Sequence, residues 1–430
     1  MNRKEFIHKS SLGALALTAS PFLIRKQAAK YTTVLIGSGW WGTNILREAI
    51  RSGEVRVAAL CDVDESQLAK CKEEVARLCN DQPKIYKDFR ECIAKEKPQI
   101  VINATPDHWH ALVAIEALNQ GAHVYLEKPI SHTVLEGAAI EKAARDNKRI
   151  CITGFHRRYS PHNASGIEFL RSGKVGKIRE VKAFVEYGGG DRVQREEQSP
   201  VPAGLDWDMY CGPAKLVTYN KGMHPRGWRQ YRNFANGQLG DWGPHWFDQI
   251  LWWSDEKAPK KVYSVATQRD RDSWSDAPTS QTVVYSFESF HLTWNHNLFN
   301  PHRETKTENV GVYFYGTEGV FHMGWIKGWT FFPNDEKKET LHEEAKLNQP
   351  DLQNIDLVWQ DFLKSIKSGQ LPHADIAHGR RATNMALLGM LSADLGRSIE
   401  WDDQNNRILK DKAANALLKR QYRSPWKYPL

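Results

Sequence analysis

The chain has 430 residues, of which 41% are hydrophobic and 26% are charged, a composition typical of a soluble globular protein rather than a disordered, fibrous or membrane-embedded one. At about 150 residues per domain, this length predicts two or three domains. The net charge is +8, but half of it comes from residues 1–29, and the remainder has no run of Lys and Arg such as nucleic-acid binding requires.

The sequence also argues against a membrane-spanning body and a metal centre. After residue 29 no stretch reaches the roughly 18 consecutive apolar residues that a transmembrane helix needs. The six cysteines form no C-x-x-C pair, so we expect neither a zinc site nor a disulfide framework, and no bound metal.

The N-terminus has the layout of an export signal. Arg3-Lys4 is followed by Phe6-Ile7 and then by a mildly apolar stretch from Ser10 to Leu23. This pattern resembles a twin-arginine signal in which lysine replaces the second arginine. Residues 1–29 are therefore interpreted as a signal, which predicts a periplasmic protein. The alternative is an N-terminal extension of a cytoplasmic protein.

A glycine-rich turn follows the first predicted strand, Thr32–Ile36. The turn reads Gly37-Ser38-Gly39-Trp40-Trp41-Gly42 and leads into a helical pattern over Asn44–Arg51. This is G-x-G-x-x-G between a strand and a helix, the context in which it binds a dinucleotide. Gly37 permits the tight turn, Gly39 lets the backbone approach a pyrophosphate, and Gly42 lets the helix pack on the strand.

The next predicted strand, Val55–Leu60, delivers Asp62, 20 residues beyond Gly42. An acid at this spacing accepts hydrogen bonds from the adenosine ribose, and it would repel a 2′-phosphate. We therefore expect NAD as the cofactor, with NADP less favoured. The alternative is that Asp62 only caps the following helix.

Strands and helices continue to alternate up to about residue 153. The further helices are expected at Glu65–Arg77, Trp109–Gln120 and Val134–Asn147, and the further strands at Ile100–Thr105, Ala122–Leu126 and Arg149–Thr153. This alternation predicts a Rossmann domain over residues 30–153, built on a doubly wound parallel sheet with its ligand at the carboxyl ends of the strands. Two polar motifs, residues 105–110 (TPDHWH) and 127–129 (EKP), follow strands and should face the nicotinamide half of the ligand.

Beyond residue 154 the pattern predicts a second, α+β domain extending to residue 430. One helix, Ala164–Ser172, precedes strands without intervening helices, which indicates a large, mainly antiparallel sheet. These strands are expected at Ile178–Tyr187, Lys261–Thr267, Gln281–Phe287, His291–Asn297, Gly311–Tyr315 and Gly319–Met323. Two helices follow, one containing Leu352 to Ile366 and one at Ile376–Leu395. The segment Gly188–Ser254 lacks such regularity, and a loop of that length is usually functional.

The glycine turn, TPDHWH and EKP together resemble the Gfo/Idh/MocA family of oxidoreductases, which includes glucose-fructose oxidoreductase and inositol dehydrogenase. Further motifs resemble an exported bacterial branch of this family, and they are found in residues 154–161 (GFHRRYSP), 204–208 (GLDWD), 240–248 (GDWGPHWFD) and 422–426 (YRSPW). The resemblance covers the chain from Tyr31 onward and specifies the fold and cofactor better than the substrate.

The resemblance implies roles for particular residues. Lys128 matches the lysine of the EKP motif, and Asp241 and His245 match a D-x-x-x-H pair; in dehydrogenase members these three perform the proton chemistry. The positions that match cofactor-lining residues are Thr105, Pro106, His108, Glu127 and, less strictly, Arg158.

Hydride transfer from a sugar carbon needs a base for the hydroxyl proton and a positive donor for the developing alkoxide. His245 suits the first role and Lys128 the second. Asp241 lies four residues before His245 and hence on the same helical face, where it could orient the imidazole, tune its pKa or bind a substrate hydroxyl.

Tryptophans are abundant around the irregular segment. Their flat apolar faces suit stacking on a sugar ring, so Trp207, Trp228 and Trp242, with Arg226, Asp241 and His245, are the predicted substrate-binding residues. Trp252 and Trp253 extend a helical stripe and are interpreted as core.

Three functions remain open at this point. The first is an NAD-dependent oxidoreductase acting on a secondary hydroxyl of a sugar or glycoside, with a tightly bound cofactor. The second is a glycoside-cleaving enzyme that uses catalytic NAD by oxidation, elimination and reduction, and the third is a non-catalytic sugar-binding protein. In each case we expect a small carbohydrate ligand and a homo-oligomer, dimer or tetramer, paired through an exposed sheet face.

Overall fold

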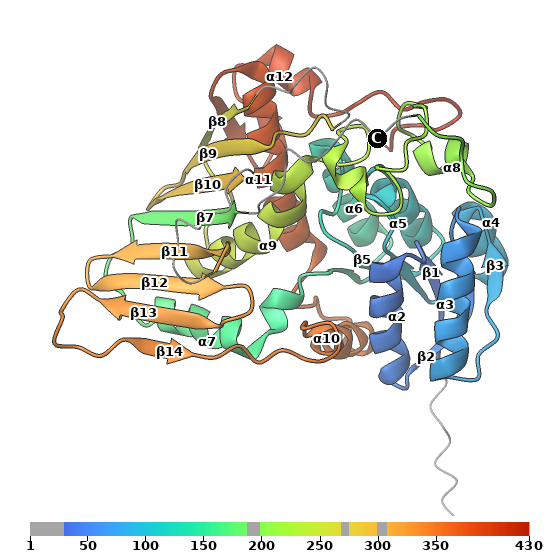
Figure 1. Ribbon diagram of the computed structural model, residues 1–430, viewed down its shortest axis with the longest axis horizontal. Helices are drawn as coiled ribbons and strands as arrows, with labels where there is room; N and C mark the ends of the chain where they lie inside the picture. The colour runs from blue at the N-terminus through green and yellow to red at the C-terminus, as the bar shows by residue number, and fades with distance from the viewer. Residues whose placement is uncertain (1–29, 187–197, 268–274, 299–307, 430) are drawn as a thin grey trace, which may run out of the picture. The chain divides into compact units, whose positions relative to one another are not determined.

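A six-stranded parallel sheet forms the first half of the protein, seen in a computed structural model that describes residues 30–186, 198–267, 275–298 and 308–429 (Figure 1). Its strand order is β3-β2-β1-β4-β5-β6, which confirms the doubly wound parallel sheet predicted from the sequence. The strands are β1 (Tyr31–Ile36), β2 (Val55–Cys61), β3 (Lys84–Tyr86), β4 (Ile100–Asn103), β5 (His123–Leu126) and β6 (Cys151–Thr153). The predicted signal, residues 1–29, lies outside the described residues.

Helices connect these strands. They are α2 (Trp40–Arg51), α3 (Glu65–Leu78), α4 (Phe89–Glu96), α5 (His110–Asn119) and α6 (Val134–Asp146). The pair β3 and α4 is absent from the sequence-based assignment. Strand β3 has only three residues, and two of them, Lys84 and Ile85, are exposed. Its sequence therefore lacks the run of apolar residues by which a buried strand is predicted. No helix in the described ranges is both long and apolar enough to span a bilayer.

The second half contains a ten-stranded sheet of order β14-β13-β12-β11-β7-β10-β9-β8-β15-β16. Neighbouring strands pair antiparallel except β7 with β10, so the prediction of a mainly antiparallel sheet is confirmed. The strands are β7 (Glu180–Glu186), β8 (Lys261–Ala266), β9 (Ser280–Ser286), β10 (His291–Asn297), β11 (Val310–Gly316), β12 (Gly319–Gly324), β13 (Trp329–Pro333), β14 (Leu341–Glu343), β15 (Ile399–Asp402) and β16 (Arg407–Ile408).

Helices cover one face of this sheet, and among the described residues the other face is exposed at β8 and β9. Burial alternates along β9, because successive side chains point to opposite faces. Tyr263, Val265 and Val284 are exposed large apolar side chains on β8 and β9. Self-association through this face stays a prediction, which native mass spectrometry would measure.

The covering helices are α7 (Pro161–Arg171), α9 (Gly237–Ser254) and α11 (Ile376–Leu395), whereas α10 (Ile355–Ser368) packs against α2 and β5 of the Rossmann domain, and the short α8 (Trp207–Cys211) and α12 (Lys412–Ala416) lie elsewhere. Both late helices were predicted. The interpretation of residues 188–254 as irregular was wrong for α9, an 18-residue helix. Three glycines and Pro244 in its first half lower its intrinsic helix propensity.

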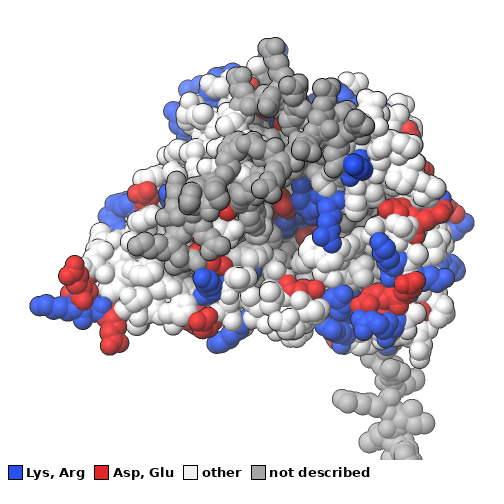
Figure 2. Space-filling view, viewed as in Figure 1, with Lys and Arg blue, Asp and Glu red and all other residues white. Residues whose placement is uncertain are grey.

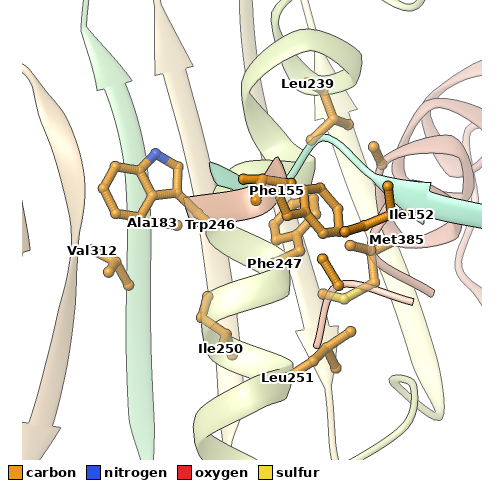
Figure 3. Packing of buried hydrophobic residues seen from close by; sticks show 14 of the residues in the cluster. Ile152, Phe155, Ala183, Leu239, Trp246, Phe247, Ile250, Leu251, Val312 and Met385 are labelled. Carbon is orange, nitrogen blue, oxygen red and sulfur yellow. The ribbon is translucent and has the colours of Figure 1, made fainter. Parts of the chain in front are cut away.

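Tertiary packing stabilises α9 despite that composition. Trp246, Phe247, Ile250 and Leu251 of α9 lie among Ala183 of β7 and residues of β6 and α11 (Figure 3). Trp246 and Phe247 are almost completely buried. At about 25 cal/mol per Å² of apolar surface, burial of such large side chains outweighs the cost of the glycines. The same helix carries Asp241 and His245, which are therefore held on a rigid element.

Candidate active site

The glycine turn between β1 and α2 is built as the motif requires. Gly37 has φ +91°, and a Cβ there would lie 2.6 Å from the carbonyl carbon and oxygen of Ala104. A Cβ on Gly42 would lie 2.0 Å from the Gly37 oxygen. Both positions therefore exclude any larger residue. Gly39 differs, because a Cβ on it would meet no atom within 4 Å, so its backbone faces open space.

A cavity of about 530 Å³ opens at this turn. It is lined by residues 37–44, Arg47, Cys61, Asp62, Val63, Gln67, Lys70, Glu74, Lys87, Phe89, Ala104, Thr105, Pro106, Trp109, Val113, Met209, Tyr210, His224, Pro225, Arg226, Trp228 and Arg229, together with Ile36. No side chain caps the N-terminus of α2, so its first N–H groups and positive potential are available to an anion. An uncapped helix, an open glycine and a cavity of this size fit the pyrophosphate of a dinucleotide.

Replacing Gly39 by alanine tests this fit. The φ of Gly39 is −66°, which alanine adopts without strain, so the cofactor-free protein should keep its melting temperature. The added methyl group would occupy space that the pyrophosphate needs. We expect NAD affinity, measured by titration calorimetry, to fall tenfold or more, about 1.4 kcal/mol. Unchanged affinity would place the pyrophosphate elsewhere.

Asp62 lies at the end of β2 and lines the cavity. Its carboxylate accepts hydrogen bonds from the backbone N–H of Ser38 (2.6 Å) and of Asp64 (3.0 Å). Burial raises the pKa of Asp62 to about 6 against the lowering effect of these bonds. The helix α3 is capped by Asp64, which accepts from Ser66 N at 2.8 Å, so the alternative that Asp62 is the helix cap is wrong.

The motifs after β4 and β5 meet at the same edge of the sheet. Thr105 and Pro106 line the cavity. His110 joins the two motifs, because its ring nitrogens lie 2.8 Å from the carbonyl oxygen of Thr105 and 2.7 Å from that of Pro129. The backbone that carries Lys128 is thereby tied to the wall of the cavity.

Lys128 and Asp241 form an ion pair beside the cavity. The lysine Nζ donates to the Asp241 carboxylate (2.8 Å) and to its backbone oxygen (3.0 Å). Arg229, a cavity-lining residue, places its Nε 3.4 Å from the same carboxylate. Burial alone would raise the pKa of Asp241, but Lys128 and Arg229 outweigh it and lower the pKa to about 2. Asp241 is therefore a fixed anion that links Lys128 to the cavity.

His245 lies one turn after Asp241 on α9. Burial, reinforced by the positive charge of Lys128, holds the pKa of His245 well below its usual range, so the imidazole is neutral. Its ring contacts those of His156 (5.2 Å between centroids) and Trp325 (5.0 Å). No hydrogen bond among the described residues joins His245 to Asp241, so Asp241 orients Lys128 rather than the imidazole.

Three residues assigned from the sequence lie away from the cavity. His108 is buried, with Nε2 2.8 Å from the Tyr210 oxygen and a pKa that burial lowers to about 3. Arg158 forms a buried ion pair with Asp248, Nε to Oδ1 2.7 Å, and does not line the cavity. Trp207 stacks on Tyr210 in a small apolar cluster. None of these three residues lines the cavity, so their assigned contacts with cofactor or substrate stay predictions.

Other assigned residues hold intermediate positions. Glu127 is buried, and its carboxylate accepts a hydrogen bond from the backbone N–H of Lys128 at 3.2 Å. Burial raises the pKa of Glu127 to about 7. Glu127 does not line the cavity. Trp242 lies beside His245, with 5.9 Å between ring centroids. Arg226 and Trp228, expected to bind sugar, line the dinucleotide cavity instead.

Several residues near the site carried no assigned role. Burial raises the pKa of Asp107 to about 8, and the positive charge of Arg229 lowers it only in part. Arg157 is buried with its guanidinium 3.6 Å from the centre of the Trp325 ring. His156 and Arg157 belong to the GFHRRYSP motif and Asp107 to TPDHWH, so the motifs contained a signal. Trp325 lies in a loop whose sequence contains no motif that would have indicated a role.

The dinucleotide site agrees with comparisons to known proteins. Residues 31–155 match the model "Oxidoreductase family, NAD-binding Rossmann fold", and residues 184–428, more than half of the chain, match "Oxidoreductase family, C-terminal alpha/beta domain". The first of these, with the fit of the cavity, identifies NAD as the cofactor.

Individual proteins are similar over parts of the chain. A putative oxidoreductase, YteT, of Bacillus subtilis is 25% identical over 50% of this chain and 43% of its own length. A glycosyl hydrolase family 109 protein of a Shewanella species is 26% identical over 33% of this chain and 32% of its own length. The chain thus matches less than half the length of either relative.

A solved structure extends the similarity to the fold. The WlbA dehydrogenase from Bordetella pertussis, in complex with NADH and UDP-GlcNAcA, has a TM-score of 0.63 at 17% identity, covering 87% of this chain and 99% of the other. The two matched domain models agree with the two sheets of the structure, the Rossmann sheet and the mainly antiparallel one. The chain belongs to the Gfo/Idh/MocA oxidoreductase family, as its motifs indicate.

Proposed function

We propose that this chain is an NAD-dependent oxidoreductase that acts on a secondary hydroxyl group of a sugar or glycoside. One observation carries the proposal. Lys128 pairs with Asp241, and Asp241 pairs with Arg229, which lines the dinucleotide cavity. When bound, NAD supplies the acceptor for the hydrogen and electron pair that leave the substrate carbon. A neighbour solved with NADH and UDP-GlcNAcA and a relative named as a glycosyl hydrolase support a carbohydrate substrate.

The protein groups divide the proton chemistry between them. His245 is neutral and takes the proton from the substrate hydroxyl. Lys128, fixed by Asp241, presents its ammonium group to the oxygen on which negative charge develops. Because α9 holds Asp241 and His245 one turn apart, the donor and the base keep a constant separation.

Glycoside cleavage is the second candidate, favoured by the match to a glycosyl hydrolase family 109 protein. Oxidation of a ring hydroxyl acidifies the C–H bond next to the new carbonyl. Loss of the proton on that carbon would expel the glycosidic substituent, which leaves as its alcohol, and would form a carbon–carbon double bond. Water would add to that bond, and the hydride that the bound cofactor would supply would reduce the carbonyl again. The same base and cation serve both reactions, so the substrate decides between them.

A panel of free sugars, methyl glycosides and aryl glycosides separates the two reactions. The purified protein is incubated with each compound while absorbance of reduced nicotinamide and release of the aglycone are recorded. A lasting absorbance rise without aglycone supports net oxidation, and aglycone release without a lasting rise supports elimination. Binding of a glycoside with neither signal would contradict both enzymatic proposals.

Export by the twin-arginine route is also proposed, on the pattern Arg3-Lys4 before Phe6-Ile7. That route carries folded proteins, so a cofactor acquired in the cytoplasm can travel with the chain. Free NAD is scarce outside the cytoplasm, which makes a retained cofactor necessary. Periplasmic fractionation of the full chain should find the protein there, and replacement of Arg3 by glutamine should leave it in the cytoplasm.

A further inference from the structure

A segment of the second domain lies on the Rossmann domain at the dinucleotide site. We call residues 198–236 the clasp. Its backbone joins the loop after β2, because Asp206 N donates to the Val63 oxygen (3.0 Å) and the Gly204 oxygen accepts from Glu65 N (3.1 Å). His224 adds a side-chain contact, with Nε2 2.8 Å from the carboxylate of Asp64. The clasp is thus attached next to Asp62, the predicted ribose ligand.

The clasp has an apolar cluster of its own. Its members are buried and include Trp207, Tyr210, Tyr219, Trp228 and Phe234. Phe234 and Tyr210 also pack against His108 of the Rossmann domain, with ring centroids 4.9 and 6.0 Å away. This explains why His108 is buried. The clasp is a packed unit rather than a loose loop.

A distant part of the chain fastens the clasp from outside. Arg423 donates to the Asp208 carboxylate (2.7 Å) and to the Gly212 oxygen (3.0 Å). Three residues further on, Trp426 packs against Trp109, with 4.7 Å between ring centroids. In Figure 1, α8 of the clasp accordingly lies beside α4 and α5 of the Rossmann domain.

The dinucleotide cavity therefore has two walls from different domains. One wall is the glycine turn with the N-terminus of α2. The other is formed by clasp residues, which are Met209, Tyr210, His224, Pro225, Arg226, Trp228 and Arg229. A dinucleotide between these walls would be enclosed rather than laid on an open sheet edge. On the face that Figure 2 shows, Lys and Arg side chains lie beside a hollow.

Arg226 is the clasp residue placed to meet the phosphates. Its guanidinium lies 5.2 Å from the ring of Trp40, the residue that begins α2. In the part of the chain that the structure describes, Arg226 has no carboxylate partner, whereas Arg229 is paired with Asp241. A pyrophosphate carries two negative charges, and the helix N-terminus supplies only partial positive charge. The guanidinium of Arg226 adds a full positive charge to balance the negative charge of the pyrophosphate.

We propose that Arg226 binds the pyrophosphate of NAD opposite the N-terminus of α2, and that the clasp holds the cofactor in place between turnovers. This inference refines the tight cofactor binding of the proposed function. It depends on NAD binding alone and not on the substrate. A protein that retains NAD but oxidises no sugar would refute the proposed function and leave this inference intact.

Cofactor release measures the effect of Arg226 directly. The protein is loaded with fluorescent etheno-NAD, and its release is followed after addition of excess unlabelled NAD. Arg226→Ala should speed release at least tenfold, and Arg226→Lys should recover part of the loss. Lys215→Ala is the matched control, since Lys215 is an exposed basic residue of the clasp outside the cavity, and it should release at the wild-type rate.

The pyrophosphate is distinguished from the rest of the cofactor by two probes. Arg226→Ala should weaken ADP-ribose binding at least tenfold and leave adenosine binding unchanged, as measured by calorimetry. Equal weakening of both would indicate distortion of the clasp and overturn the assignment. A raised KM for the sugar with unchanged NAD release would also overturn it, because Arg226 would then be the substrate residue that the sequence suggested.

Discussion

Replacing Lys128 by methionine is expected to lower kcat by a factor of about 10²–10³ or more while NAD remains bound. Methionine keeps most of the length and the apolar stem of the lysine but removes the ammonium that we propose stabilises the developing alkoxide. Asp241 keeps Arg229 as a partner, so the ion cluster loses one member without leaving a lone buried charge. Steady-state kinetics give kcat, and extraction of the protein gives its NAD content.

The matched control for this change is Lys142→Met. Lys142 lies on α6 with its side chain 74% exposed, and its ion pair in the described part of the chain is with Asp146 of the same helix. Its kcat and NAD content should equal those of the wild type. A normal kcat in Lys128→Met would remove Lys128 from the reaction, and loss of NAD from that variant would make it a cofactor-binding residue instead.

Arg158→Met is expected to lower the free energy of unfolding by about 3–5 kcal/mol. The guanidinium and the Asp248 carboxylate are both almost fully buried, at 3% and 1% exposure of their side chains. Removing one partner leaves the other charge without compensation in an apolar surrounding. Urea denaturation of the cofactor-free protein measures the loss, and NAD affinity of the folded protein should be unchanged.

Arg51→Met provides the comparison on the surface. Arg51 pairs with Glu48 at 2.6 Å on α2, but its side chain is 47% exposed, so water replaces the lost contact and the stability change should be much smaller. If instead Arg158→Met left stability intact and weakened NAD binding, the sequence-based assignment of Arg158 to the cofactor would be supported.

The parts of the site that were predictable from sequence are those encoded by contiguous residues. The glycine turn depends on the φ of Gly37 and the small size of Gly42, which any reader of the chain can infer from local backbone requirements. Asp62 follows at a spacing set by one helix and one strand. These features need no knowledge of distant contacts, and the parallel sheet follows from the same alternation.

Residues whose surroundings come from distant segments were assigned less well. His108 is 102 residues from Tyr210, whose carbonyl it contacts, and Arg158 is 90 residues from Asp248. No residue close to His108 or Arg158 in the sequence indicates which partner each will contact. Trp207 and Trp228 were both predicted to bind the sugar, and both pack in the clasp cluster, but Trp228 also lines the cavity whereas Trp207 does not. Such distinctions arise only from tertiary packing.

The contact between Arg423 and Asp208 spans 215 residues and bears on the timing of synthesis. A ribosome releases the glycine turn and the whole parallel sheet long before it translates Arg423 and Trp426. The clasp, which is translated between the two, therefore exists for a time without the outer fastening that Arg423 and Trp426 provide. The retention of NAD that we propose for the clasp would then reach its full strength only after residues 423–426 have been translated and have docked.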